Sequence, residues 1–311
     1  MPAIKQNEHE RLISMYFDVI IIGGSYAGMS AGLQLARARR DILVVDADER
    51  RNRFAKSSHG FLGQDGRDPG LIAADAREQL QRYPTVHWLN AKAQSAKRIE
   101  AGFSVTVGAG ELLKGKRLIL ATGVVDRLPA IPGLQERWGK SVFHCPYCHG
   151  YELDQGRIGV IASSELSMHH ALMLPDWGTT TLFTNGAFVP DADQSSQLRA
   201  RSVTIETAPV REIRGDRADV VLEDGRIIAM DGLFTLTQTS VPAPWAEQLG
   251  CAFEDGPVGR FISTDAMKQT TAKGVFACGD AARAAGSVAL SVGDGALAGT
   301  AAHRSLMFDN D

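Results

Sequence analysis

A glycine-rich turn between an apolar strand and a helix constrains the fold of this chain more than any other sequence feature. The apolar run Phe17–Ile22 leads into Gly23-Gly24-Ser25-Tyr26-Ala27-Gly28, and a helical pattern follows over Met29–Arg39. The next apolar strand covers 42–45 and ends at Asp46. This order is a βαβ unit, and continuous apolar strands are typical of a parallel sheet that is covered on both faces. The sequence therefore predicts an α/β fold.

The residue types in this turn are those that bind a dinucleotide. Gly23 allows the tight turn, Gly28 allows close helix–strand packing, and the helix N-terminus offers N–H groups to a pyrophosphate. Asp46 would accept hydrogen bonds from the ribose hydroxyls of the adenosine. The middle position holds Ser25 instead of glycine, which hinders the close approach of a phosphate without blocking it. A tight turn that binds no ligand is the alternative interpretation.

Length and charge narrow the class of protein further. A chain of 311 residues is long enough for about two domains. The net charge of −3 disfavours nucleic acid as the main partner. Apolar runs are too short for a membrane-spanning helix, and the polar start of the chain lacks the apolar core of a secretory signal. We therefore expect a cytoplasmic protein without a membrane partner.

The strand and turn patterns predict two domains, one inserted into the other. Short alternating segments over 86–120 indicate an antiparallel meander, and Pro129 marks a crossing between domains. A second, weaker βαβ pattern begins near 157, and the pattern of the first domain returns after about 252. We expect a first domain formed by 14–129 and 253–311, and an inserted domain, 130–252.

A pair of cysteines three residues apart carries the clearest chemical signal. Cys145 and Cys148 are flanked by His144 and His149, and only Pro146 and Tyr147 separate them. A CxxC segment lets two sulfurs form a small ring, and histidines beside it can hold the protons that thiol–disulfide exchange requires. This favours a redox-active disulfide. Attachment of a c-type haem and a metal site made of all four residues are the alternatives, and glutaredoxins also contain CPYC.

Taken together, these motifs resemble those of the thioredoxin reductase family over residues 17 to about 305. The resemblance implies FAD as cofactor, a homodimer, and two Rossmann-like (three-layer ββα) domains in the low-molecular-weight thioredoxin reductase architecture. It assigns two further FAD contacts, Thr122-Gly123 and Gly279-Asp280. It also makes Cys148 the sulfur that faces the flavin and Cys145 the one that exchanges with substrate. The family's acidic residue after the pair is replaced by His149, which becomes the acid–base candidate, with His144 second.

The inserted domain lacks the sequence features of an NADPH site. No glycine is present in Ala162–Ser167, where the family has GxGxxA, and Glu165 would repel a pyrophosphate. After the strand at 180–185, no arginine occurs until Arg199, although the 2′-phosphate needs a basic cluster. This loss resembles the branch of dithiol oxidases that close disulfides in natural products such as gliotoxin and holomycin. The resemblance implies oxidation of a small dithiol with dioxygen as acceptor.

Two other functions stay open at this point. One is a reductase of a thioredoxin-like protein, fed by NADPH or by ferredoxin, and the other is a flavin redox sensor without turnover. His59 lies in a loop that, by resemblance, passes near the flavin, so that it has either a flavin or substrate role or only a loop hydrogen bond.

Overall fold

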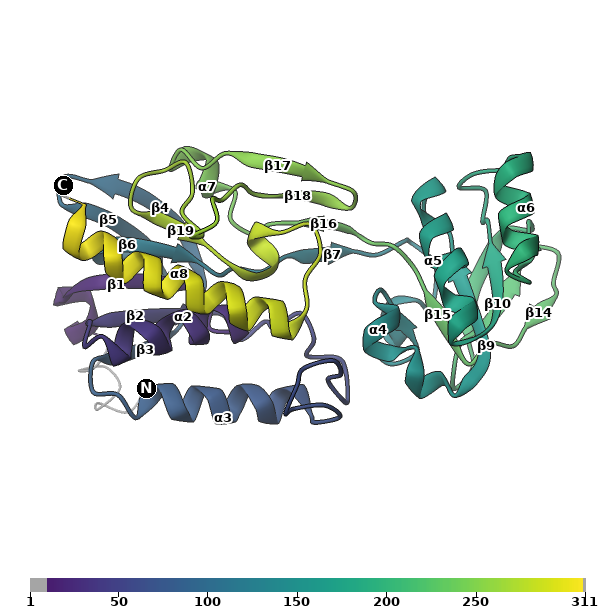
Figure 1. Cartoon of the computed structure of the whole chain (residues 1–311), viewed down its shortest axis with the longest axis horizontal. Helices are drawn as coiled ribbons and strands as arrows, with labels where there is room; N and C mark the ends of the chain where they lie inside the picture. The colour runs from purple at the N-terminus through teal and green to yellow at the C-terminus, as the bar shows by residue number, and fades with distance from the viewer. Residues whose placement is uncertain (1–9, 310–311) are drawn as a thin grey trace. The chain divides into compact units, whose positions relative to one another are not determined.

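The computed structural model describes residues 10–309, which form two compact units (Figure 1). Of the described residues, the first unit contains 10–53, 70–125 and 239–309. The second unit contains 54–69 and 126–238. Residues 1–9, which form most of the segment used for the expectation about a secretory signal, lie outside the described residues.

Among the described residues, a seven-stranded sheet forms the centre of the first unit. The strand order is β3-β2-β1-β6-β5-β4, and β19 also pairs with β6. Besides β1, the long strand β6 has two further partners: its first half pairs antiparallel with β5, and its second half pairs parallel with β19. The strands are β1 (Tyr16–Ile22), β2 (Ile42–Asp46), β3 (Val86–Asn90), β4 (Ala93–Ile99), β5 (Gly102–Val107), β6 (Glu111–Leu120) and β19 (Val275–Ala277).

Two helices pack against each other beside this sheet, α2 (Tyr26–Arg37) and α8 (Val288–Phe308), as Figure 1 shows. Their backbones approach closely, because a Cβ atom at Gly295 of α8 would lie 2.1 Å from the carbonyl oxygen of Ala27. The close packing of α8 against α2 therefore requires small residues, such as Gly295, on this face of α8. The remaining elements of this unit are α3 (Pro69–Gln81), α7 (Trp245–Gln248), the hairpin β17 (Phe253–Gly256) and β18 (Gly259–Ile262), and η5 (Gly279–Ala282).

The second unit repeats the parallel βαβ arrangement on a smaller scale. In the described chain its main sheet has five strands in the order β11-β10-β9-β15-β8, and a three-stranded antiparallel sheet, β12-β13-β14, accompanies it. The strands are β8 (Val142–Phe143), β9 (Gln155–Ile161), β10 (Gly178–Phe183), β11 (Thr204–Glu206), β12 (Val210–Arg214), β13 (Asp219–Leu222), β14 (Ile227–Ile228) and β15 (Gly232–Phe234). The helices are η1 (Gln135–Arg137), α4 (Pro146–His149), η2 (Tyr151–Leu153), η3 (Glu165–Ser167), α5 (Met168–Met173), η4 (Leu174–Asp176) and α6 (Ala192–Ala200).

The observed units differ from the expected domain ranges in two places. Residues 239–252 pack in the first unit, because Trp245 and Leu249 belong to the same core cluster as Phe17. Residues 54–69 pack in the second unit, where Gly139 lies against Phe54 so closely that an added Cβ atom would be 2.8 Å from the Cβ of Phe54. Besides the crossings at the two ends of 54–69, the chain passes from one unit to the other in β7 (Val125–Arg127) and β16 (Gln238–Ser240), which pair with each other.

None of the helices in the described part of the chain is both long enough and apolar enough to cross a membrane.

Candidate active site

The cysteine pair forms a disulfide at the start of a short helix in the second unit. The Cα atoms of Cys145 and Cys148 are 5.3 Å apart, and the pair directly follows β8 and His144. Cys145 is the N-cap of α4, and Pro146 takes the first helical position, where a missing N–H costs nothing. The Cys148 N–H donates to the Cys145 carbonyl at 3.2 Å. Both cysteines are partly exposed, so a thiol of a substrate can reach the disulfide.

Each of the two histidines that flank the cysteine pair stacks on a neighbouring aromatic ring. His149 stacks on Phe143 with ring centroids 4.3 Å apart, and burial, with a smaller electrostatic contribution from His59, lowers the pKa of His149 to about 4. His144 stacks on Trp138 at 5.9 Å. At neutral pH, His149 is therefore a neutral imidazole.

Within residues 10–309, no group of three or more His, Cys, Asp or Glu residues is placed to hold a metal ion.

His170 supports the segment before the cysteines, which the sequence did not indicate. Its imidazole hydrogen-bonds the backbone of His144, and burial lowers the pKa of His170 to about 4. The side chain belongs to α5 and packs edge-on against Phe234. The sequence does not reveal this contact, because the pattern around a histidine on a helix is the same whether its ring packs in the core or supports another segment.

His59 lies in the same unit as the cysteine pair. Its Nε2 is 3.3 Å from Oε1 of Glu152 in η2 and 3.0 Å from the Ser57 hydroxyl. Its Nδ1 is 3.6 Å from Oδ1 of Asp65. The side chain of His59 is only 17% exposed. Glu152 was missed from the sequence, although it follows Cys148 by four residues.

The predicted cofactor residues meet at one edge of the first sheet. Ile22 of β1 is in register with Val45 of β2 and Leu120 of β6, and Leu120 is in register with Ala277 of β19. The carboxyl ends of four adjacent parallel strands therefore lie side by side. The residues that follow these ends, or form them, are Gly23, Asp46, Thr122-Gly123 and Gly279-Asp280. Such an edge is where open α/β sheets bind dinucleotides.

Backbone packing requires the glycines in the first turn. A Cβ atom at Gly23 would lie 2.1 Å from the Ala121 carbonyl oxygen, and one at Gly28 would lie 1.8 Å from the Gly23 carbonyl oxygen. The Gly24 N–H donates to Oδ1 of Asp46 at 3.1 Å. Ser25 is the N-cap of α2, and within the described residues its side chain makes no capping hydrogen bond. N–H groups at the start of a helix, such as those of α2, can donate hydrogen bonds to the phosphate oxygens of a ligand.

The two later segments, Thr122-Gly123 and Gly279-Asp280, also have features that suit a bound dinucleotide. The hydroxyl oxygen of Thr122 is buried and has no hydrogen-bond partner among residues 10–309, which an incoming polar group would satisfy. Gly123 and Gly279 have φ angles of +62° and +67°, which favour glycine. Asp280 is paired with Arg51 at 2.8 Å, a partner that the sequence did not reveal. These features suit the binding of FAD, and the Arg51–Asp280 ion pair belongs to the same set of residues.

The turn after β9 in the second unit is closed by its own side chains. The Ser163 N–H donates to the Ser167 hydroxyl at 3.1 Å, and the Ser163 hydroxyl donates to the Leu236 carbonyl at 2.9 Å. Glu165 accepts a hydrogen bond from Gln194 of α6 at 2.6 Å. The Ser163 N–H of this turn is therefore engaged within the chain, and the side chain of Glu165 adds negative charge to the same turn.

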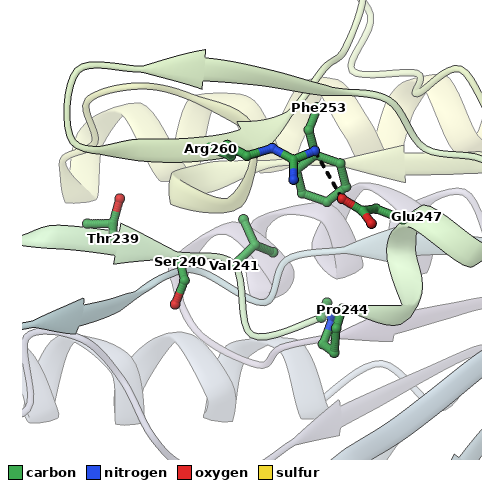
Figure 2. Close-up of a pocket in the computed structure, with 8 residues that line it drawn as sticks. Thr239, Ser240, Val241, Pro244, Glu247, Phe253 and Arg260 are labelled. Atoms are coloured by element: carbon green, nitrogen blue, oxygen red, sulfur yellow. Dashed lines mark ion pairs between the residues drawn. The ribbon is translucent and has the colours of Figure 1, made fainter.

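A pocket of about 300 Å³ lies elsewhere in the first unit, near the hairpin β17–β18 (Figure 2). Arg260 packs over the ring of Phe253 at 4.8 Å and forms an ion pair with Glu247 at 3.0 Å. The charged groups of this wall neutralise each other. None of the predicted site residues lines the pocket, so it is separate from the candidate site.

Comparison with known proteins assigns the chain to a family. Residues 17–301 match the pyridine nucleotide-disulphide oxidoreductase family, and the chain belongs to it. The chain is 33% identical to the thioredoxin reductase tcpT of Claviceps purpurea, over 94% of this chain and 95% of the relative. The predicted class, an enzyme similar to thioredoxin reductases, is therefore confirmed, and the protein is a flavoprotein oxidoreductase.

Two solved structures confirm the fold. An oxidoreductase from Agrobacterium tumefaciens has 64% sequence identity and a TM-score of 0.92, with 95% of this chain and 100% of that chain covered. The crystal structure of HlmI has 33% identity and a TM-score of 0.87, with 93% of this chain and 92% of that chain covered. The predicted α/β class with two Rossmann-like domains is confirmed by these matches.

Proposed function

We propose that the protein is an FAD-dependent dithiol oxidase, which converts a small dithiol into a disulfide, passes the electrons to dioxygen and does not use NADPH. The closed turn in the second unit is the observation that carries the proposal. The Ser163 N–H is already bound by Ser167, and Glu165 contributes negative charge at the same turn. A disulfide, together with a turn after β9 that is closed by its own side chains, fits an enzyme that takes its electrons from thiols.

The first unit would hold FAD through the edge described above. The N–H groups at the start of α2 would face the pyrophosphate, and Asp46 would bind the ribose of the adenosine. Thr122 would satisfy its buried hydroxyl on the cofactor, and Asp280 would lie at the ribityl or phosphate side. When bound, FAD supplies two-electron acceptance from a dithiol and transfer of those electrons to dioxygen, which becomes hydrogen peroxide.

The cysteine pair carries out the thiol chemistry by two exchange steps. A substrate thiolate attacks the Cys145 sulfur, the Cys145–Cys148 bond breaks, and Cys148 leaves as a thiolate with the electron pair. The second substrate thiolate then attacks the substrate sulfur of the mixed disulfide, and Cys145 leaves as a thiolate. The substrate has lost two electrons and two protons, and the cysteine pair has gained the two electrons. His149, with His144 as the second candidate, would take up the protons.

Direct binding of NADPH tests the loss of its site. We expect no saturable heat when NADPH is titrated to millimolar concentration into the FAD-loaded protein in a calorimeter, because the turn after β9 presents Glu165 and an occupied Ser163 N–H. The flavin spectrum before and after the titration controls for retained cofactor. Saturable binding in the micromolar range would restore the NADPH-fed reductase, whose substrate would be a thioredoxin-like protein.

The assembly is proposed from the family resemblance, and the location is the one that the sequence led us to expect. We propose a cytoplasmic homodimer, and exposed apolar residues on α8, including Leu297 and Phe308, are compatible with burial against a second copy. Light scattering after gel filtration is expected to give twice the chain mass of 33.4 kDa. A mass near that of one chain would contradict the dimer, and fractionation of the source cells would test the location.

A further inference from the structure

The indole of Trp88, in β3, packs against the first glycine turn of the cofactor edge. A Cβ atom added at Gly24 would lie 2.5 Å from Cζ2 and Cη2 of this indole and 2.7 Å from the Cβ atom of Asp46. The indole and the Asp46 side chain therefore border the same backbone position. Because the proposed function assigns Asp46 to the ribose of the adenosine, Trp88 lies beside the adenosine half of the proposed FAD site.

Strand pairing places these side chains on one face of the sheet. β2 and β3 are parallel, with Val44 in register with Trp88 and Asp46 in register with Asn90. Side chains alternate between the two faces along a strand, so residues two positions apart share a face, and neighbours in register share it too. Trp88, Asn90 and Asp46 therefore lie on the same face, near the carboxyl ends of their strands.

Two further side chains fix the orientation of the ring. The Nε1–H of Trp88 donates to Oδ1 of Asn90 at 3.0 Å, and Nη2 of Arg77 donates to the same oxygen at 3.3 Å. The guanidinium carbon of Arg77, which belongs to α3, lies 4.1 Å from the centroid of the indole. With a hydrogen bond at its edge and a cation over its face, the indole is held in one orientation.

The position of this cluster distinguishes two flavin cofactors. FAD contains an adenosine, whereas FMN ends at its first phosphate. Asp46 would contact only the adenosine half, while Asp280 is assigned to the ribityl or phosphate side. A residue that acts through Asp46 should therefore matter for the binding of FAD and not for that of FMN.

We propose that Trp88, held by Arg77 and Asn90, is a positioning residue for the adenosine half of FAD: its indole keeps Gly24 and Asp46 in the arrangement that binds the ribose, and it thereby makes the site select FAD over FMN. The inference rests on FAD as the cofactor of the proposed function and deepens it. Because Trp88 acts through Asp46, its loss changes which flavin binds, and not only how stable the protein is.

Titration of the flavin-free full chain with FAD and with FMN tests the assignment without turnover, with flavin fluorescence as the readout. Trp88→Ala should weaken FAD binding by about tenfold or more and leave FMN binding within about twofold of the wild-type value. Trp88→Phe keeps a ring and loses one hydrogen bond, so it should weaken FAD binding by only about threefold. Arg98 gives the matched control, because its guanidinium stacks over Phe103 at 4.7 Å and β4 lies at the opposite end of the strand order from β3. Arg77→Ala should weaken FAD binding, and Arg98→Ala should not.

The comparison of the two flavins separates this role from a general loss of stability. Equal weakening of FAD and FMN in Trp88→Ala would indicate a merely structural role and overturn the proposal, as would unchanged FAD binding or a wild-type chain that binds FMN as tightly as FAD. A wild-type chain that binds neither flavin would overturn FAD as the cofactor, and the proposal with it. Bleaching of the bound flavin by NADPH would instead overturn the dithiol oxidase function, while the selection of FAD would stand.

Discussion

Replacing Cys145 by serine is expected to lower dithiol turnover by at least about a thousandfold, because serine cannot form the mixed disulfide on which the exchange depends. The disulfide with Cys148 is absent in this variant, so a substrate thiolate has no sulfur to attack. The measurement is peroxide formation in air with a small dithiol, at equal flavin content. Cys148→Ser should lose turnover to a similar degree, since the two sulfurs act as a unit.

Cys251 gives the matched control for this prediction. It is buried in the first unit, its sulfur lies 3.6 Å from the Thr270 hydroxyl, and burial raises the pKa of its thiol. Such a thiol is a poor nucleophile at neutral pH. Cys251→Ala should therefore keep turnover within about twofold of the wild-type value. Retention of more than about a tenth of the turnover in Cys145→Ser would show that dithiols reduce the flavin without the cysteine pair.

The second large effect concerns a single methyl group in the first turn. Gly28→Ala is expected to destabilise the protein by about 2 kcal/mol or more, because the added Cβ would lie 1.8 Å from a backbone oxygen of Gly23. Neither atom can move without opening the turn that would bind the pyrophosphate. Purified Gly28→Ala should therefore also contain less FAD. Urea unfolding and the ratio of flavin to protein absorbance measure the two effects.

Gly293 is the control, because it is also a helical glycine. It is exposed on α8, and a Cβ atom built there meets no atom within 4 Å. Alanine favours a helix over glycine, so Gly293→Ala should be neutral or stabilise the protein by up to about 1 kcal/mol, with normal FAD content. If Gly28→Ala were as stable and as yellow as Gly293→Ala, the account of the turn would be wrong.

Local sequence patterns predicted the parts of the fold that local chemistry determines. The buried strand β1, the glycine turn and the helix after it follow from apolar runs and glycine placement over fewer than 30 residues. The cysteine pair is equally local, because Cys145 and Cys148 belong to one helical turn. The parallel βαβ rule places the end of β2 beside the end of β1, and the pairing of β6 with β1 brings Asp46 and Thr122 to the same edge of the sheet.

Long-range contacts were beyond reach of the sequence. The Arg51–Asp280 pair joins residues 229 positions apart, and no periodicity links them. His59 and Glu152 belong to segments that only the packing of 54–69 against the second unit brings together. Residues 239–252 were placed in the inserted domain because the pattern of the first domain returns only later, whereas the buried side chain of Trp245 completes the first core.

The most direct test of the central claim compares two reductants of the flavin in the absence of air. A small dithiol in one cuvette and NADPH in another are mixed with the purified protein, and the flavin absorbance near ~450 nm is followed. The account predicts bleaching by the dithiol and none by NADPH, with colour and hydrogen peroxide returning on aeration. Rapid bleaching by NADPH, or a flavin that the dithiol leaves oxidised, would contradict it.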